Sequence, residues 1–177
     1  MDCPAPHPPA TDGVRPPTAS GLRLQRVPFT HPDAQLLVGQ VQQEYVTRYG
    51  GPDNTPFDAT VFDPPAGAFF VGYLDDLPSA CGGWRFRPDV QALGRVLAAE
   101  VKRMYVAPPA RRAGHARAVL THLESTAREA GADLMVLETG LKQPEAIALY
   151  LSSGYQPVHP FGHYAWSPTA RYYGKPL

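Results

Sequence analysis

The stretch that begins at Ala99 changes from a strand pattern to a helix pattern within a few residues, and this change constrains the fold most. Strand-like residues end at Val106, a Pro-Pro turn follows, and Gly114 precedes a helical repeat of apolar side chains. Because glycine tolerates positive φ, such a loop can direct backbone N–H groups to one point, where the next helix also presents its free N–H groups and positive dipole end. The stretch predicts a strand–loop–helix unit that binds a diphosphate-bearing ligand.

Three arginines, Arg111, Arg112 and Arg117, add positive charge around this loop. The alternative is an ordinary loop glycine followed by the solvated start of a helix. Two other phosphate motifs are excluded, because the chain has neither Gly-x-x-x-x-Gly-Lys-Ser/Thr nor a Gly-x-Gly-x-x-Gly after a strand.

Hydrophobic periodicity predicts the remaining elements. Helices are expected over residues 32–49, 112–130 and 144–154, with a loop over 53–65. Strands are expected over residues 22–27, 68–74, 79–87, 99–106, 134–138, 155–158, 163–167 and 172–177, the second and third forming a hairpin around Asp75, Asp76 and Pro78. The order predicts a mixed α/β sheet with a β-α-β unit whose loop binds the ligand at the carboxyl end of a strand.

The length of 177 residues and the 44% hydrophobic content fit one domain, which we place at residues 22–177. Residues 1–21 hold six prolines and few large apolar side chains, so they are predicted to form a disordered leader. The leader is either dispensable or a docking segment for a partner chain.

Charge and cysteine content exclude several functional classes. The 16 basic and 16 acidic residues cancel, which favours small-molecule partners over nucleic acid or a membrane surface. Cys3 and Cys81 give no disulfide framework, and neither they nor the histidines have the spacing of a metal site. Because the chain also lacks a signal peptide and a run of about 20 apolar residues, a cytoplasmic setting is expected.

Two separated motifs resemble a known superfamily. The run A-E-V-K-R-M-Y-V-A-P-P-A-R-R-A-G-H-A-R-A-V-L-T-H-L is followed by L-M-V-L-E-T-G and P-E-A-I-A-L-Y-L-S-S-G-Y, together covering roughly Ala99 to Tyr155. This combination is similar to the GNAT superfamily of acyl-CoA-dependent N-acyltransferases. The ending with G-Y-x-P, F-G-x-Y and R-Y-Y-G-K is similar to a bacterial subgroup of small GNAT proteins. The resemblance implies a mostly antiparallel mixed sheet of about seven strands with flanking helices.

The resemblance implies acetyl-CoA as cosubstrate. Arg111, Gly114 and Ala116 correspond to the family's Gln/Arg-x-x-Gly-x-Gly/Ala signature, whose backbone amides hold the coenzyme A pyrophosphate. The family also splays the preceding strand from its neighbour, so that its main chain can pair with the pantetheine arm. Gln143 stands where many relatives have asparagine, three residues before Ala146. The implied cofactor-binding residues are Met104, Tyr105, Val106, Arg111, Arg112, Ala113, Gly114, His115, Ala116, Arg117, Gln143 and Ala146.

Tyr150 matches the tyrosine that many relatives place beside the coenzyme A sulfur as general acid. With an ordinary pKa of about 10, its phenol is protonated at neutral pH and can donate. The alternative is a core aromatic whose hydroxyl is satisfied.

Glu100 is the candidate base, fourteen residues before Gly114, an offset that also occurs in histone-type relatives. Strand alternation puts it on one face with Lys102 and Met104, and Val101, Arg103 and Tyr105 on the other. Because Lys102 shares its face, Glu100 is alternatively a structural ion pair.

Aromatic and arginine side chains from two regions are candidates for the acceptor site. Tyr45, Arg48, Tyr49 and Asp53 lie where the family usually covers that site, and Phe86, Arg87, Tyr164, Trp166 and Arg171 could line it from the other side. They suit a small amine that also carries a carboxylate. The alternative is core aromatics with solvated arginines.

The sequence therefore predicts an N-acetyltransferase that transfers an acetyl group directly to a primary amine of a small molecule, in a ternary complex without a metal. Neither cysteine has an activating partner in the sequence, which disfavours a covalent intermediate. Alternatives are acetylation of a protein N-terminus or lysine, an acyl-CoA sensor or scaffold without transferase activity, and a site for another nucleotide. Dimers are common in the family, so a homodimer is one assembly that the resemblance implies.

Overall fold

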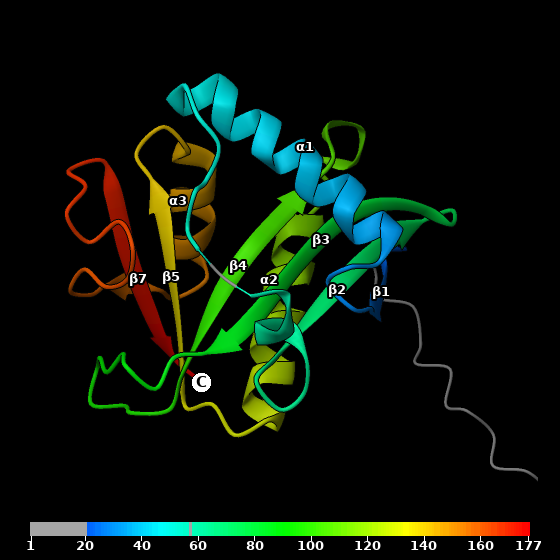
Figure 1. Ribbon diagram of the computed structural model, residues 1–177. Helices are drawn as coiled ribbons and strands as arrows, with labels where there is room; N and C mark the ends of the chain where they lie inside the picture. The colour runs from blue at the N-terminus through cyan, green and yellow to red at the C-terminus, as the bar shows by residue number, and fades with distance from the viewer. Residues whose placement is uncertain (1–20, 57) are drawn as a thin grey trace, which may run out of the picture.

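The computed structural model describes residues 21–56 and 58–177, which form one seven-stranded sheet with three α-helices (Figure 1). The strand order is β1-β2-β3-β4-β5-β7-β6, and only β4 and β5 run parallel. The elements are β1 (Arg23–Arg26), α1 (Pro32–Tyr49), η1 (Ala59–Phe62), β2 (Gly67–Leu74), β3 (Leu77–Phe86), β4 (Ala98–Val106), η2 (Pro108–Ala110), α2 (His115–Glu129), β5 (Leu134–Gly140), α3 (Pro144–Ser152), β6 (Gln156–Pro157) and β7 (Ala170–Pro176). The predicted mixed, mostly antiparallel sheet is confirmed. The predicted leader lies outside the described residues apart from Gly21, as does Cys3.

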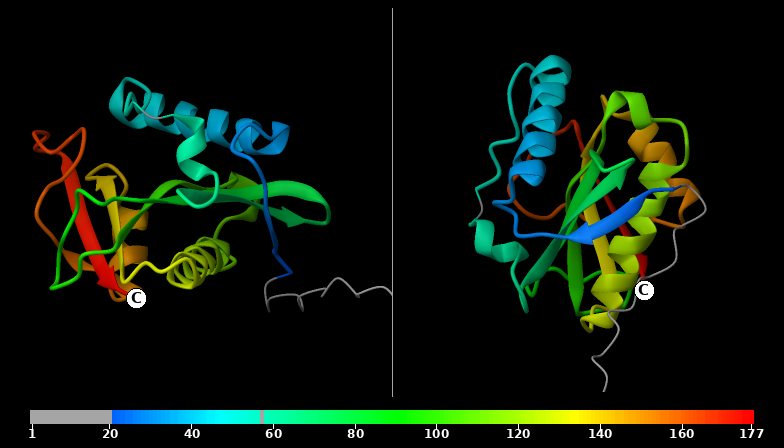
Figure 2. Two further views of the ribbon diagram at one scale, coloured as in Figure 1. Left: turned by 60° about the horizontal axis from the view of Figure 1, so that its bottom comes forward. Right: turned by 90° about the vertical axis from the view of Figure 1, so that its right-hand side faces the viewer.

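The sheet separates two hydrophobic cores (Figure 2, left). Helix α1 covers one face, where Leu37 and Val41 pack with Phe69. Helices α2 and α3 cover the other, where Val119 and Leu123 belong to the larger core. We call these the α1 face and the α2 face.

Most elements begin and end close to their predicted positions, and three differ. The α2 helix begins at His115 rather than at residue 112, because Arg112 and Gly114 have left-handed backbone angles, with φ of 63° and 82°. Residues 163–167 form turns rather than the expected strand. In the hairpin, Asp75 and Asp76 alone form the turn, with φ of 48° and 59°, and Pro78 already belongs to β3.

The predicted division of β4 into two faces is wrong beyond Lys102, because the strand contains a β-bulge. Arg103 has a φ of 54°, and the pairing register with β3 shifts between Cys81 and Gly83. A bulge adds one residue to a strand and so reverses the alternation after it. Met104 therefore packs in the core of the α2 face, whereas Arg103 contacts Asp53 on the α1 face, where Lys102 also lies.

Strands β4 and β5 separate after a short parallel stretch. Their pairing ends at Glu100 and Val136, although β4 continues to Val106 and β5 to Gly140. Figure 1 shows the two strands diverging toward their carboxyl ends. The expected splay is therefore present, and we call the gap that it leaves in the backbone pairing of the sheet the opening between β4 and β5.

Candidate functional site

The loop between β4 and α2 has the geometry of an anion cradle. Gly114 is the N-cap of α2, adopts a left-handed conformation and makes no side-chain cap hydrogen bond. Within residues 21–56 and 58–177, the backbone N–H groups of Arg112, Ala113 and Gly114 donate no hydrogen bond. The first N–H groups of α2 lack partners inside the helix as well. Free N–H groups at a helix start, with its positive dipole end, suit a diphosphate.

The side chains of this loop hold the surrounding elements together. Arg111 donates from Nε to the Val106 carbonyl at 2.8 Å and pairs with Glu44 of α1. Arg117 donates to Ser152 Oγ at 2.8 Å and to Ser153 Oγ at 3.0 Å, at the end of α3.

Three residues at the starts of α2 and α3 are buried or partly buried. His115 is buried, and its Nδ1 finds no hydrogen-bond partner in the described part of the chain. Ala116 of α2 and Ala146 of α3 both pack against the core of the α2 face. The two helix starts therefore share one packing cluster beside the opening.

Tyr150 of α3 and Tyr45 of α1 approach each other, although their helices cover opposite faces of the sheet. Both phenols are buried, and the Tyr150 phenol is close enough to contribute to the raised pKa of Tyr45, of which burial is the main cause. Burial also raises the pKa of Tyr150 above its usual value. Tyr45 lines a cavity on the α1 face, so Tyr150 lies near this cavity from the core of the α2 face.

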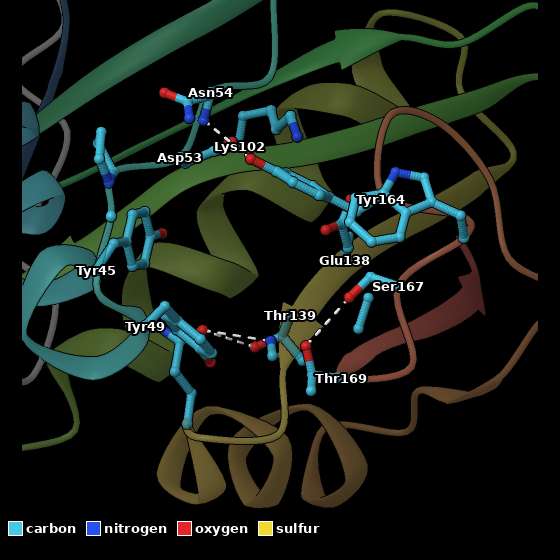
Figure 3. A pocket seen from close by; sticks show the side chains of 16 residues that line it. Tyr45, Tyr49, Asp53, Asn54, Lys102, Glu138, Thr139, Tyr164, Ser167 and Thr169 are labelled. Atoms are coloured by element: carbon cyan, nitrogen blue, oxygen red, sulfur yellow. Dashed lines mark hydrogen bonds between the residues drawn. The ribbon is translucent and has the colours of Figure 1, made fainter.

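This cavity of about 390 Å³ lies on the α1 face beside the opening between β4 and β5. Its walls come from the end of α1 and the loop after it, from β4, from the carboxyl end of β5 and from the loop before β7 (Figure 3). Five of the nine predicted acceptor-site residues line it: Tyr45, Tyr49, Asp53, Tyr164 and Trp166. Gln143 also lines it, whereas the other predicted cofactor-binding residues do not.

Phe86 and Arg48, also expected to line the acceptor site, do not line this cavity. Phe86 lies on the α2 face, where its ring packs against Trp84 at 5.3 Å, because alternation along β3 turns it away from the cavity. Arg48 pairs with Glu145 and donates to the Lys142 carbonyl at 2.7 Å, so it ties α1 to the loop after β5.

Two further arginines named for the acceptor site also lie outside the cavity walls. Arg87 pairs with Asp89 and Glu100. Arg171 donates to the carbonyl oxygens of Pro168 and Ala170.

Glu100 is 1% exposed and surrounded by cations. Its carboxylate accepts from Arg85 Nε at 3.0 Å and Arg87 Nη1 at 2.6 Å, and it lies 3.3 Å from Lys102 Nζ. Burial alone would raise the pKa of Glu100, but Lys102, Arg85 and Arg87 together hold it below its usual value. A general base needs access to its proton and a pKa near the working pH. These contacts therefore fit the structural ion pair better than the base.

A different glutamate, Glu138, lies in the cavity wall, and the sequence argument did not single it out (Figure 3). Burial raises its pKa to about 7, with Lys102 opposing the shift. Among the described residues, its carboxylate makes no hydrogen bond or ion pair. One signal was available, because Glu138 is the acidic residue at the carboxyl end of the apolar run L-M-V-L.

Asp53 is the other acidic residue of the cavity, and its role is structural. Burial would raise the pKa of Asp53, but Arg103 and two hydrogen bonds from Thr55 lower it to about 2. Its pair with Arg103 anchors the loop after α1 to the bulge in β4. In the same loop, the Asn54 N–H donates to the Tyr164 hydroxyl at 2.9 Å, which joins two walls of the cavity.

The described residues contain no group of three or more His, Cys, Asp or Glu side chains placed to hold a metal ion. Nor do they include a helix with the length and apolar character that crossing a membrane requires.

Comparison with known sequences identifies one family and one curated relative. The family described as "Acetyltransferase (GNAT) family" matches residues 38–155. A protein of Azospirillum brasilense named IAA acetyltransferase is 44% identical over 78 residues, which cover 44% of this chain and 51% of that protein. The chain therefore matches about half the length of this relative.

Solved structures with the same fold cover nearly the whole described chain. A Klebsiella pneumoniae protein assigned as an acyl-CoA N-acyltransferase has a TM-score of 0.71 at 24% identity, over 89% of this chain and 99% of its own. The PaiA N-acetyltransferase of Thermoplasma acidophilum, solved in complex with coenzyme A, has a TM-score of 0.64 at 11% identity, over 88% and 99%. At these identities the likeness shows the fold alone.

Proposed function

This chain belongs to the acetyltransferase (GNAT) family, and from that premise we propose that it transfers an acetyl group from acetyl-CoA directly to a primary amine of a small molecule. One observation carries the proposal. Strand β4, which separates from β5 beyond Glu100, ends at the loop whose N–H groups are free around Gly114, and its Lys102 lines an aromatic cavity on the α1 face. A donor with a diphosphate and a long thioester arm fits the first part, and a small acceptor fits the second.

The donor side rests on backbone geometry rather than on side-chain charge. The N–H groups of residues 112–114 and of the first turn of α2 would hold the pyrophosphate. Beyond Glu100, β4 has no partner strand on its β5 side, so its main-chain groups there can pair with the amide-containing arm of coenzyme A. Met104, Tyr105 and Val106 belong to this unpaired part of β4.

The acceptor side combines aromatic and charged side chains in the lining of the cavity. Tyr45, Tyr49, Tyr164 and Trp166 supply flat apolar surface, and Lys102 and Glu138 supply opposite charges. A cavity of about 390 Å³ suits a small molecule rather than a folded partner. An amine with an aromatic or aliphatic body, and a carboxylate for Lys102, matches this lining.

Direct transfer is supported by the state of the thiol and the phenol near the opening. Cys81 is fully buried, burial raises its pKa above the usual value, and Sγ donates to the Arg103 carbonyl at 3.3 Å. It therefore offers no exposed thiolate for a covalent intermediate. The Tyr150 phenol is protonated at neutral pH, and burial raises its pKa further, so it carries a proton that it can give to the departing thiolate.

A thiol-release assay with acetyl-CoA tests the proposal, with 2-phenylethylamine, L-phenylalanine, L-lysine and a lysine-containing peptide as acceptors. Turnover of a small amine is expected. Binding of coenzyme A without turnover of any acceptor would instead support a sensor, and turnover of the peptide alone would support protein acetylation. The Tyr150→Phe variant should lose about 100-fold in kcat, as expected for a lost proton transfer, with acetyl-CoA affinity nearly unchanged. An unchanged kcat would remove Tyr150 from the mechanism.

The cradle is tested by calorimetry with coenzyme A on Gly114→Ala. At a φ of 82° a side chain costs about 1–2 kcal/mol of backbone strain. If the backbone rotates to relieve this strain, the N–H groups turn away from the diphosphate, so the affinity for coenzyme A should fall about tenfold. Gly131→Ala is the matched control. Gly131 has a φ of 103° and equally open surroundings but follows the far end of α2, so its variant should lose stability and keep its affinity. Equal affinities in the two variants would contradict the assignment of the cradle.

A further inference from the structure

Glu138 is the titratable residue of β5 that lines the cavity, where Thr139 and Gly140 lie beside it. Along β5, Met135 and Leu137 pack in the core of the α2 face, whereas Leu134 and Val136 lie in a separate cluster. Alternation therefore places Glu138 on the α1 face, two residues beyond Val136, where pairing with β4 ends. Its carboxylate lies at the edge of the opening through which the thioester would enter.

The close-up view shows how this carboxylate is surrounded (Figure 3). Glu138 lies between the two tyrosines of α1, Tyr45 and Tyr49, and the C-terminal loop that carries Tyr164 and Ser167. An acceptor amine held between these aromatic walls would have Glu138 within reach, directly or through one water.

We propose that Glu138 of β5, rather than Glu100 of β4, is the general base that takes a proton from the acceptor amine. The proposal rests on the function proposed above and deepens it. Glu138 is the carboxylate of the cavity that no cation neutralises by direct contact among the described residues, whereas Asp53 is paired with Arg103 and Glu100 with three cations. Its pKa of about 7 also suits a base that must accept and release protons near neutral pH.

The charged and titratable groups that face Glu138 come from four parts of the chain. They are Lys102 and Glu100 of β4, Arg87 after β3, Asp53 after α1, and Tyr172 opposite Glu138 on β7. Lys102 and Arg87 lower the pKa of Glu138, Asp53 and Glu100 raise it, and burial is the largest cause. Burial, the largest cause, acts in the same direction as the two carboxylates and sets the direction of the shift.

The proton and electron balance follows from the chemistry of amide formation. The substrate ammonium gives one proton to the Glu138 carboxylate, and the free amine attacks the thioester carbonyl carbon to form the C–N bond. As the C–S bond breaks, its electron pair goes to sulfur, which gains a proton from the Tyr150 phenol. The nitrogen loses its second proton, which restores the phenol through solvent. Glu138 returns its own proton to the cavity water, so one proton is released per acetyl transfer.

Carbon-13 NMR of the full chain labelled at glutamate Cδ tests the first requirement without any substrate. The chain has six glutamates, so the spectrum is simple. One carboxyl should titrate near pH 7, and its resonance should disappear in Glu138→Gln. Glu124→Gln is the matched control, because Glu124 is also a buried carboxylate but lies on the α2 face beside Lys175. If the resonance that titrates near pH 7 remains in Glu138→Gln, the proposal is overturned.

The second arm measures acetyl transfer to the best acceptor of the panel named above, from pH 5.5 to pH 9. Glu138→Gln should lower kcat at pH 7 by about 100-fold or more and abolish the acidic ionisation in the rate profile, with KM for acetyl-CoA unchanged. Glu124→Gln should keep both the rate and the ionisation. If Glu138→Gln retains its rate and Glu100→Gln loses the ionisation, the base is Glu100. The inference then fails, while the proposed acetyl transfer stands. If the wild-type chain binds coenzyme A but acetylates no acceptor, the proposed function fails and the inference fails with it.

Discussion

Glu100 and Glu138 are two glutamates on adjacent parallel strands with opposite surroundings. Glu100 is opposite Val136, the last residue of β5 that pairs with β4, and Glu138 lies only two residues further along β5. Three cations contact Glu100 and hold its pKa below the usual range, whereas burial raises the pKa of Glu138 to about 7. Where the strands remain paired the carboxylate is part of the scaffold, and where they separate it faces a cavity.

The point at which β4 and β5 separate determines which of the two carboxylates is surrounded by cations. In the paired region, side chains from β3, β4 and the segment after β3 converge on Glu100 and fill the space around it. Beyond the last pair, β5 has no neighbour on its β4 side, so Glu138 lacks these partners. A partly buried carboxylate without an ion-pair partner is costly for folding, and such groups cluster at functional sites.

The largest expected effect is on stability when Glu100 loses its charge. Glu100→Gln leaves three cations close together without their carboxylate, so the free energy of unfolding should fall by about 3–5 kcal/mol in urea at pH 7. Glu124→Gln is the control, because Glu124 contacts one cation, Lys175 at 2.8 Å, and should cost less. A loss of less than about 1 kcal/mol in Glu100→Gln would show that Glu100 is not part of the scaffold and would contradict the contrast between the two glutamates.

The pH dependence of stability should be opposite for the two glutamates. Because folding raises the pKa of Glu138 from 4.5 to about 7, its contribution is fully present below pH 4.5 and is lost as the pH rises through 7. Because folding lowers the pKa of Glu100, its contribution is present above pH 4.5 and is lost in acid. After a discount for partial solvent exposure, Glu138→Gln should gain about 1–2 kcal/mol relative to wild type between pH 5 and pH 8.

Urea unfolding of wild type and Glu138→Gln at several pH values measures this difference in unfolding free energy. Groups that both chains share, such as the histidines, contribute equally to both and cancel in the difference. A difference that is constant from pH 5 to pH 8 would show that Glu138 has no raised pKa in the folded state.

The smallest expected effect concerns Lys102, the cation that influences both glutamates. Lys102 lowers the pKa of Glu138 and contacts Glu100 at 3.3 Å, so Lys102→Met should move the Glu138 titration to higher pH in the carbon-13 spectrum. Arg85→Met is the control, because Arg85 contacts Glu100 but is not among the groups that shift Glu138. If both variants shift the titration equally, the two carboxylates share one charge network rather than forming two distinct regions.

Much of the fold could be predicted from local patterns. The helix over Pro32–Tyr49, the hairpin strands and the unit from β4 through α2 to β5 follow from periodicity, proline turns and glycine caps, which are properties of short segments. The placement of Tyr45, Tyr49, Tyr164 and Trp166 around one cavity followed from the resemblance. The start of α2 was missed because the left-handed angle at Arg112 is unusual for a residue other than glycine.

The amino-acid sequence by itself determined the order of elements, the Gly114 loop and the family to which the chain belongs, because these depend on residue types at short spacing. Only the tertiary structure decided which carboxylate is neutralised and which is free. The bulge at Arg103 reversed the faces of β4, and the separation of β4 from β5 ended the packing that surrounds Glu100 just before Glu138. Both features arise from contacts between distant segments, so no local pattern encodes them.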